Sequence, residues 1–328
     1  MKSLIVAIRN KKHIAWLFLA VIISSYAFPL TQELDDVDTF GDYASLLKVH
    51  DTCDLVLMAD PSDLIQPNFL KIWFNCFSYK VLGNDRMMPL VFSVGLVYLA
   101  YLLGHYITND RIIGLISSAT LSINPLLTTY DTSPTYDQAW TFFLILSVVL
   151  LYKKSIIAPM VYPLAILCKV LAFGYLPVFI YNIISEPIKH KKLSLGIIAV
   201  SVLFGVVVVM QSWITQSISF NPERLADGSL QLLIHLMLLL PVLGIFTLFL
   251  VMLKAKTKII GTRIVYIWMI WILLTTPLLY VFSQDFQFSY RYVPFAAFMS
   301  IFIGISIVNF GNKVVEMLPK KVTGELKT

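Results

Sequence analysis

Residues 87–107 read MMPLVFSVGLVYLAYLLGHYI, an apolar run that contains no Asp, Glu, Lys or Arg. About 20 such residues match the ~30 Å hydrocarbon core of a bilayer when they form a helix. Inside that core every backbone N–H and C=O must find a partner within the protein, so we expect helices. A transmembrane β-barrel needs short segments of alternating polarity, and this sequence does not alternate.

The composition of the whole chain agrees with this interpretation. Of 328 residues, 58% are hydrophobic and 13% are charged, and the mean hydropathy is +0.79. A soluble domain would carry about twice that charged fraction. We therefore predict an all-α fold, a polytopic transmembrane helical bundle that forms a single membrane domain over 1–328. The predicted spans lie near 13–30, 87–107, 112–129, 138–152, 156–169, 171–184, 194–214, 230–253, 262–282 and 292–310.

The first run, 13–30, follows several Lys and Arg residues and has a competing interpretation as a signal peptide. A cleavage site requires small residues, whereas Tyr26, Phe28 and Pro29 are bulky. We expect this segment to remain as the first transmembrane helix.

The distribution of charge predicts the topology. Lys and Arg gather in every second connecting segment, as the positive-inside rule describes, and this clustering does not indicate a nucleic-acid partner despite the net charge of +6. We place these segments and both termini in the cytoplasm, including a short basic tail at 312–328, and we expect the plasma (inner) membrane. The cationic segments contain Arg111; Lys153 and Lys154; Lys189, Lys191 and Lys192; Lys254, Lys256, Lys258 and Arg263; and Lys313, Lys320 and Lys321.

One stretch, 156–184, is too long for one comfortable span and short for two. A single helix would place His190, Lys191 and Lys192 outside and reverse every later loop. Two short helices with a turn near Lys169 keep the charge rule, and we prefer them.

The segment 31–86 is the one large extracytoplasmic loop that we predict. Nine of the chain's 19 acidic residues fall between Glu33 and Asp63. The patterns at 43–49 and 65–82 predict amphipathic helices that lie in the membrane interface. Cys53 and Cys76 share this loop. The sequence does not give the distance between them, so a disulfide and a pair of free thiols are both alternatives.

Two groups of carboxylates on this outer side are candidates for chemistry. Asp35, Asp36 and Asp38 follow the first span, and crowded carboxylates can act as a base or share a cation. Asp137 immediately precedes a later apolar run. The simpler interpretations are a solvated acidic loop for the first group and a helix N-terminal charge for Asp137.

Two cations on the same side are also candidates. Lys169 lies between apolar residues, where an ammonium must reach the interface or find a partner such as a lipid phosphate. Arg291 lies between Tyr290 and Tyr292 before the last span. It suits a phosphate, or simply anchors the helix at the interface.

Carboxylates and cations on one membrane face suit a reaction in which a hydroxyl is deprotonated while a phosphate leaves. The five His residues show no metal-binding spacing. The sequence also contains no P-loop, dinucleotide-binding glycine motif or Ser nucleophile elbow.

Several short motifs occur in a defined order along the chain. They are Asp36-Val37-Asp38, Tyr43-Ala44, the Pro-containing 66–73, Leu82-Gly83-Asn84-Asp85-Arg86, Asn124-Pro125-Leu126, Asp137, Leu167-Cys168-Lys169 and Arg291-Tyr292-Val293-Pro294. In order and spacing they resemble the GT-C fold membrane glycosyltransferases of the dolichyl-phosphate-mannose protein mannosyltransferase and aminoarabinose transferase type. The resemblance runs from about Asp35 to Lys169 and returns at Arg291.

This resemblance implies an inverting transfer of a sugar from a polyprenyl-phosphate carrier to an acceptor hydroxyl on the extracytoplasmic face. It implies a first-loop aspartate as the base, with Asp38 preferred and Asp36 second. It also implies Asp137, Lys169, Arg291 and Tyr292 as substrate-binding residues. The chain departs from the family in its Asp-Asp pairs, where Asp-Glu is common, and in the absence of a C-terminal extracytoplasmic domain.

The expected partners are a polyprenyl-phosphate-linked sugar, membrane lipids and a glycan, lipid or protein acceptor. The sequence identifies no cofactor, and it leaves both a metal-free site and a site with a divalent metal ion as alternatives. Two alternatives remain. A transporter or flippase for a lipid-linked or anionic solute would place charges near the membrane midplane and show internal repeats. A non-catalytic assembly subunit would tolerate neutral replacements of Asp36 and Asp38.

Overall fold

The protein is helical throughout the part that the computed structural model describes, which is residues 2–34, 43–58, 68–136, 138–185, 191–214, 220–230, 262–281 and 289–317. Within these ranges 85% of the residues are helical and no strand occurs, which confirms the all-α prediction. The helices of the first half are α1 (Lys2–Asn10), α2 (Lys12–Gln32), α3 (Tyr43–His50), α4 (Cys53–Leu57), α5 (Phe69–Leu82), α6 (Met87–Thr108), α7 (Arg111–Ser122), α8 (Pro125–Thr128) and α9 (Ala139–Tyr152). The second half contains α10 (Ala158–Cys168), the 3₁₀ helix η2 (Val170–Tyr175), α11 (Leu176–Ser185), α12 (Lys191–Ile214), α15 (Thr262–Tyr280), the 3₁₀ helix η3 (Ser289–Tyr292) and α16 (Val293–Met317).

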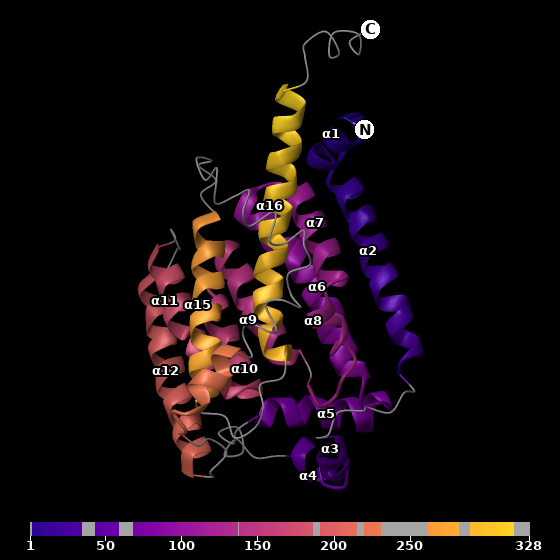
Figure 1. Ribbon diagram of the computed structural model, residues 1–328. Coiled ribbons are helices and arrows are strands. Elements are labelled where there is room, and N and C mark those ends of the chain that lie inside the picture. The colour runs from indigo at the N-terminus through magenta and orange to yellow at the C-terminus, as the bar shows by residue number, and fades with distance from the viewer. Residues whose placement is uncertain are drawn as a thin grey trace.

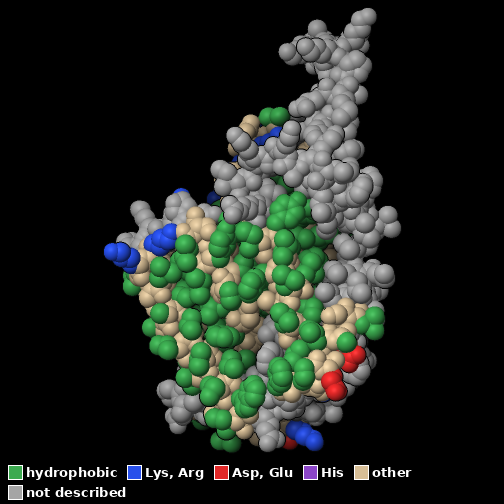
Figure 2. Space-filling view, turned by 60° about the vertical axis from the view of Figure 1, so that its left-hand side comes forward, with side chains coloured by type: hydrophobic (Ala, Val, Ile, Leu, Met, Phe, Trp, Pro, Cys, Tyr) green, Lys and Arg blue, Asp and Glu red, His purple; other side chains and the backbone are tan. Residues whose placement is uncertain are grey.

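Among the described residues, four helices are long and apolar enough to cross a membrane, which indicates a membrane protein. They correspond to α2, α6, α12 and α16. Figure 2 shows a surface dominated by hydrophobic side chains, with charged side chains towards its upper and lower ends. An apolar surface of this extent is typical of contact with lipid. Exposed apolar side chains on α12 and α15 are Val200, Leu203, Val206, Val207, Met210, Trp213, Ile214, Ile270, Leu274 and Leu278.

Of the other apolar helices in the described part of the chain, α7, α9 and α10 are shorter than a full span, whereas α15 has 19 residues. The predicted run 112–129 is divided between α7 and α8, because Asn124 caps α8 through its side chain and Pro125 begins that helix. The predicted span 230–253 lies outside the described residues. The total of about ten membrane crossings therefore stays a prediction.

The predicted break near Lys169 is confirmed. The helix α10 ends at Cys168, and Lys169 has an extended backbone (φ −155°, ψ 117°) before η2 begins. Tyr162 Oη donates to the carbonyl oxygen of Ala172 at 2.6 Å, which ties the two sides of the break together. A single helix through this stretch is thereby excluded.

The two ends of the bundle differ in character (Figure 1). Helix α1 and the C-terminal end of α16 lie at one end, while α5 lies across the opposite end with α3 and α4 beyond it. At the end that contains α1, Arg9 forms an ion pair of 2.8 Å with Asp110, a residue in the connection between α6 and α7. Arg111 also donates to the carbonyl oxygen of Arg9 at 2.6 Å.

The core lies where α6, α7, α9, α15 and α16 pack together, around buried side chains such as Leu96, Trp140, Trp268 and Phe298. Glycines permit the closest approach. A Cβ at Gly114 in α7 would lie 2.6 Å from the carbonyl oxygen of Tyr101 in α6. The bundle therefore depends on the absence of a side chain at this crossing.

A disulfide between Cys53 and Cys76, with an S–S distance of 2.08 Å, joins α4 to α5. The sequence left a disulfide and two free thiols as alternatives, and the structure has the disulfide. Lys80 on α5 also pairs with Asp54 on α4 at 3.0 Å. The predicted interfacial helices at 43–49 and 65–82 correspond to α3 and to the α5 segment Phe69–Leu82.

Candidate functional site

The structure describes only part of the predicted site. Asp36, Asp38 and Asp137 lie outside the described residues, so the carboxylate half of the site stays a prediction. Lys169, Arg291 and Tyr292 are described. They come from the break after α10 and from the 3₁₀ turn η3 that leads into α16.

Lys169 and Tyr290 are bonded directly. Lys169 Nζ donates to Tyr290 Oη at 2.6 Å, and the ammonium also lies 5.1 Å from the centre of the Tyr290 ring. The Arg291 guanidinium lies 6.0 Å from the same ring centre. The Lys169 ammonium lies beyond the phenol end of the ring and is held by its bond to Oη, so one tyrosine side chain contacts two cations.

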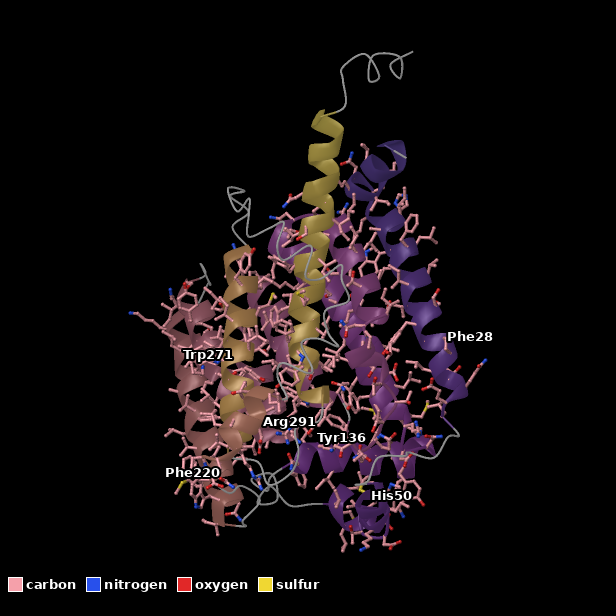
Figure 3. The ribbon with its side chains drawn as sticks, viewed as in Figure 1. Phe28, His50, Tyr136, Phe220, Trp271 and Arg291 are labelled. Atoms are coloured by element: carbon pink, nitrogen blue, oxygen red, sulfur yellow. A yellow bond between two sulfur atoms is a disulfide. The ribbon has the colours of Figure 1, made fainter. Side chains whose placement is uncertain are left out.

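Tyr290 belongs to a buried group of three tyrosines, which we call the tyrosine cluster: Tyr130, Tyr136 and Tyr290. The rings of Tyr136 and Tyr290 are stacked with their centres 4.9 Å apart, and Tyr130 meets both rings edge-on at 5.9 Å. Figure 3 shows Tyr136 and Arg291 at the end of the bundle that faces α5. The cluster joins the segment between α8 and α9 to the beginning of α16.

A third cation reaches the same place from α5. Lys71 Nζ donates to the carbonyl oxygen of Thr135, next to Tyr136. Its neighbour on the helix face, Asn75, donates to the carbonyl oxygen of Pro134 at 3.1 Å. The positive charges of Lys71 and Arg291 both act on the Lys169 ammonium. We call Lys71, Lys169 and Arg291 the cation cluster.

Three cations held this close repel one another, and an anion bound among them would relieve that repulsion. Each ammonium carries three N–H donors and a guanidinium carries five, and these are the donor types that bind phosphate oxygens in proteins. Arg291 is buried, with 8% of its surface exposed, where charge interactions are screened less than in water.

Tyr292 takes a different position from its neighbour Tyr290. It is fully buried and belongs to the main hydrophobic core beside Val293 and Phe295. The structure therefore brings Tyr290 to the cation cluster and places the predicted Tyr292 in the packing beneath it.

A second polar group lies where α2 ends. Tyr26 Oη donates to Asp131 Oδ2 at 3.2 Å, and Ser93 Oγ donates to the carbonyl oxygen of Asp131 at 2.8 Å. Thr132 Oγ1 donates to Glu33 Oε2 at 3.3 Å and accepts from Arg86 at 3.0 Å. We call these residues the α2 junction. Burial and the nearby Glu33 carboxylate raise the pKa of Asp131 to about 7.

Sequence reasoning missed Lys71, Tyr290 and Asp131 as site residues. Lys71 carried the same signal that identified Lys169, a lysine among apolar residues, but its helix was interpreted only as an interfacial one. Asp131 lies in the segment that was singled out for Asp137. For a metal ion, no group of three or more His, Cys, Asp or Glu residues comes together among the described residues, and the first-loop aspartates lie outside them.

The geometry of the site thus consists of a cation cluster and a carboxylate-containing junction, both built on the segment between α8 and α9. The chain was compared with protein-family models, curated proteins and solved structures, and none of the three comparisons gave a match.

Proposed function

We propose that this protein is a glycosyltransferase of the GT-C type that moves a sugar from a polyprenyl-phosphate carrier to an acceptor hydroxyl outside the cytoplasm. The observation that carries the proposal is the meeting of Lys71, Lys169 and Arg291 around the tyrosine cluster. These cations come from three distant parts of the chain. They converge at the bundle end next to the acidic loop 31–86.

In the proposed reaction the acceptor oxygen attacks the anomeric carbon from the face opposite the phosphate. The bond from that carbon to the phosphate oxygen breaks, and the carrier phosphate leaves with the electron pair. Asp38, or Asp36, takes the hydroxyl proton. The cation cluster stabilises the negative charge that develops on the leaving phosphate.

The position of the disulfide and the distribution of Arg residues support an extracytoplasmic site in the plasma (inner) membrane. A disulfide such as Cys53–Cys76 forms in oxidising compartments, and it lies at the α5 end of the bundle. Arg9 and Arg111 lie at the other end, as the positive-inside rule expects for a cytoplasmic face. The exposed apolar faces of α12 and α15 suit contact with lipid, including the carrier's polyprenyl tail.

A transporter or flippase is the alternative. Transporters bind their solutes near the middle of the membrane, on broken helices. Lys71 belongs to a helix that lies across the bundle end, so the cation cluster favours chemistry at the surface. A flippase would move polyprenyl-phosphate sugar across a vesicle bilayer without releasing free polyprenyl phosphate.

The test uses the full chain in proteoliposomes with a radiolabelled polyprenyl-phosphate hexose and a membrane extract that supplies glycan, lipid and protein acceptors, and it measures the release of polyprenyl phosphate. We expect the combined Asp36→Asn and Asp38→Asn variant to lose release, and Lys169→Met or Arg291→Met to weaken binding of the carrier. Asp54→Asn, which changes an exposed loop carboxylate paired with Lys80, is the matched control. Parental release by all of the site variants would remove the enzyme proposal and leave the assembly-subunit interpretation.

A further inference from the structure

The α2 junction holds the C-terminal part of α2 and the residue after it by bonds from two other parts of the chain. Asp131 accepts from Tyr26 within α2, and Thr132 donates to Glu33, which caps the helix. Asn84 Nδ2 donates to the carbonyl oxygen of Leu34 at 2.8 Å, one residue further on. These contacts determine the place from which the chain continues toward Asp36 and Asp38.

Asp131 is the member of this junction whose charge is most poorly accommodated. Only 2% of its surface is exposed, and its carboxylate accepts from the neutral phenol of Tyr26 and from backbone N–H groups, whereas Ser93 bonds to its carbonyl oxygen. The charged and titratable groups that face it in the described structure are Tyr26 on α2, Glu33 directly after α2, and Arg86, which reaches Thr132 from before α6. Arg86 donates to the Thr132 hydroxyl. Burial of Asp131 and the like charge of Glu33 disfavour ionisation of the Asp131 carboxyl.

We propose that Asp131 is a proton-controlled positioning residue, which holds the end of α2 against the segment between α8 and α9 when protonated and loosens this junction when ionised. The neutral carboxyl keeps the Tyr26 bond without repelling Glu33. The ionised carboxylate places a second negative charge beside Glu33 in a buried site. The effect of this change on sugar transfer rests on the proposed function, whereas the proton binding does not.

The sign of the expected stability change follows from the raised pKa of Asp131. The folded protein keeps this proton up to about pH 7, whereas an ordinary Asp loses it near 3.8. Between these limits the folded state binds more protons than the unfolded state, so its stability falls as pH rises. Above about pH 7 the loss is complete.

The first experiment measures the melting temperature of the purified full chain in detergent between pH 5 and pH 8. We expect the parent to lose several degrees over this range, and Asp131→Asn, which imitates the protonated carboxyl, to lose much less. Asp54→Asn removes an exposed carboxylate and should keep the parental slope. A parental slope in Asp131→Asn would overturn the proposal.

Two further variants keep the proposal testable if Asp131→Asn fails to fold. Glu33→Gln removes the repelling charge and should shift the midpoint of the pH dependence to lower pH. Tyr26→Phe removes a hydrogen bond that favours the carboxylate and should shift the midpoint to higher pH. Shifts in the same direction, or no shift in either variant, would also overturn it.

The second experiment measures release of polyprenyl phosphate as a function of pH. We expect the kcat of the parent to change with pH around about pH 7. The kcat of Asp131→Asn should lack this change, and its KM should stay within about twofold of the parental KM. Parental protein that releases nothing would count against the proposed function alone, because the melting experiment does not use the substrate. Parental activity with an unchanged pH profile in Asp131→Asn would count against the positioning role alone.

Discussion

Lys169 Nζ and Tyr290 Oη lie 2.6 Å apart although 121 positions separate the two residues in the sequence. The bond connects the break after α10 with the turn that precedes α16. Because Lys169 has an extended backbone where α10 ends, its side chain is free of the helix and can reach across to Tyr290. The break after α10 and the turn before α16 thus supply two of the three residues of the cation cluster, Lys169 and Arg291.

We expect Lys71→Met to weaken the binding of polyprenyl phosphate about 10- to 100-fold, because a hydrogen bond to a charged group contributes about 1.5–3 kcal/mol. The binding constant can be measured by titration of the detergent-purified protein with short-chain polyprenyl phosphate. Lys80→Met is the matched control, since Lys80 lies on the same helix but is exposed and pairs with Asp54. Equal effects of the two substitutions would show that Lys71 has no special role.

We expect Tyr290→Phe to separate stability from binding. It keeps the stacked ring but removes the acceptor of the Lys169 bond, which should lower the free energy of unfolding by about 1–3 kcal/mol. Affinity for polyprenyl phosphate should stay the same or increase, because the phosphate no longer competes with the phenol for Lys169. Chemical unfolding and the binding titration measure the two effects, and a large loss of affinity would contradict this account.

We expect the combined Cys53→Ala and Cys76→Ala variant to lose about 3 kcal/mol of unfolding free energy, since the bridge closes a loop across 23 positions. A reductant should lower the melting temperature of the parent but leave this variant unchanged. Cys168→Ala, which replaces a buried cysteine outside the disulfide, should respond to the reductant like the parent. An unresponsive parent would argue against the disulfide.

We expect Gly114→Ala to destabilise the protein by about 1–3 kcal/mol, because the new Cβ would lie 2.6 Å from the carbonyl oxygen of Tyr101. Gly196→Ala in α12 meets no atom within 4 Å and should be neutral, or stabilising by about 0.5–1 kcal/mol. Melting temperatures of both variants measure the difference. Similar values for the two would show that the α6–α7 crossing can relax.

The helices were predictable because their signal is local. A run such as 87–107 must pair its backbone internally wherever it lies, and α6 begins at Met87 as the run does. The break at Lys169 was also predictable, because the charge rule constrained the direction of every later helix. The division of 112–129 was missed because the Asn124–Pro125 start signal of α8 follows α7 closely within one apolar run.

The site was predictable only where a residue was unusual in its own surroundings. Lys169 and Arg291 are charges beside apolar runs, so each stood out alone. Lys71 also has apolar neighbours, but its role depends on a carbonyl oxygen 64 positions away, and helical periodicity does not reveal which loop packs on α5. Asp131 owes its burial to contacts with α2 and α6 together, and a linear pattern contains no measure of that packing.

The cation cluster also has a consequence for protein synthesis. Tyr290 and Arg291 are among the last residues of the described structure to leave the ribosome, whereas Lys71 and Lys169 are made much earlier. A nascent chain that stops before η3 would carry most of the bundle but neither the acceptor for Lys169 nor the Arg291 guanidinium. Premature termination should therefore yield a polypeptide that inserts into the bilayer with its cation cluster unassembled.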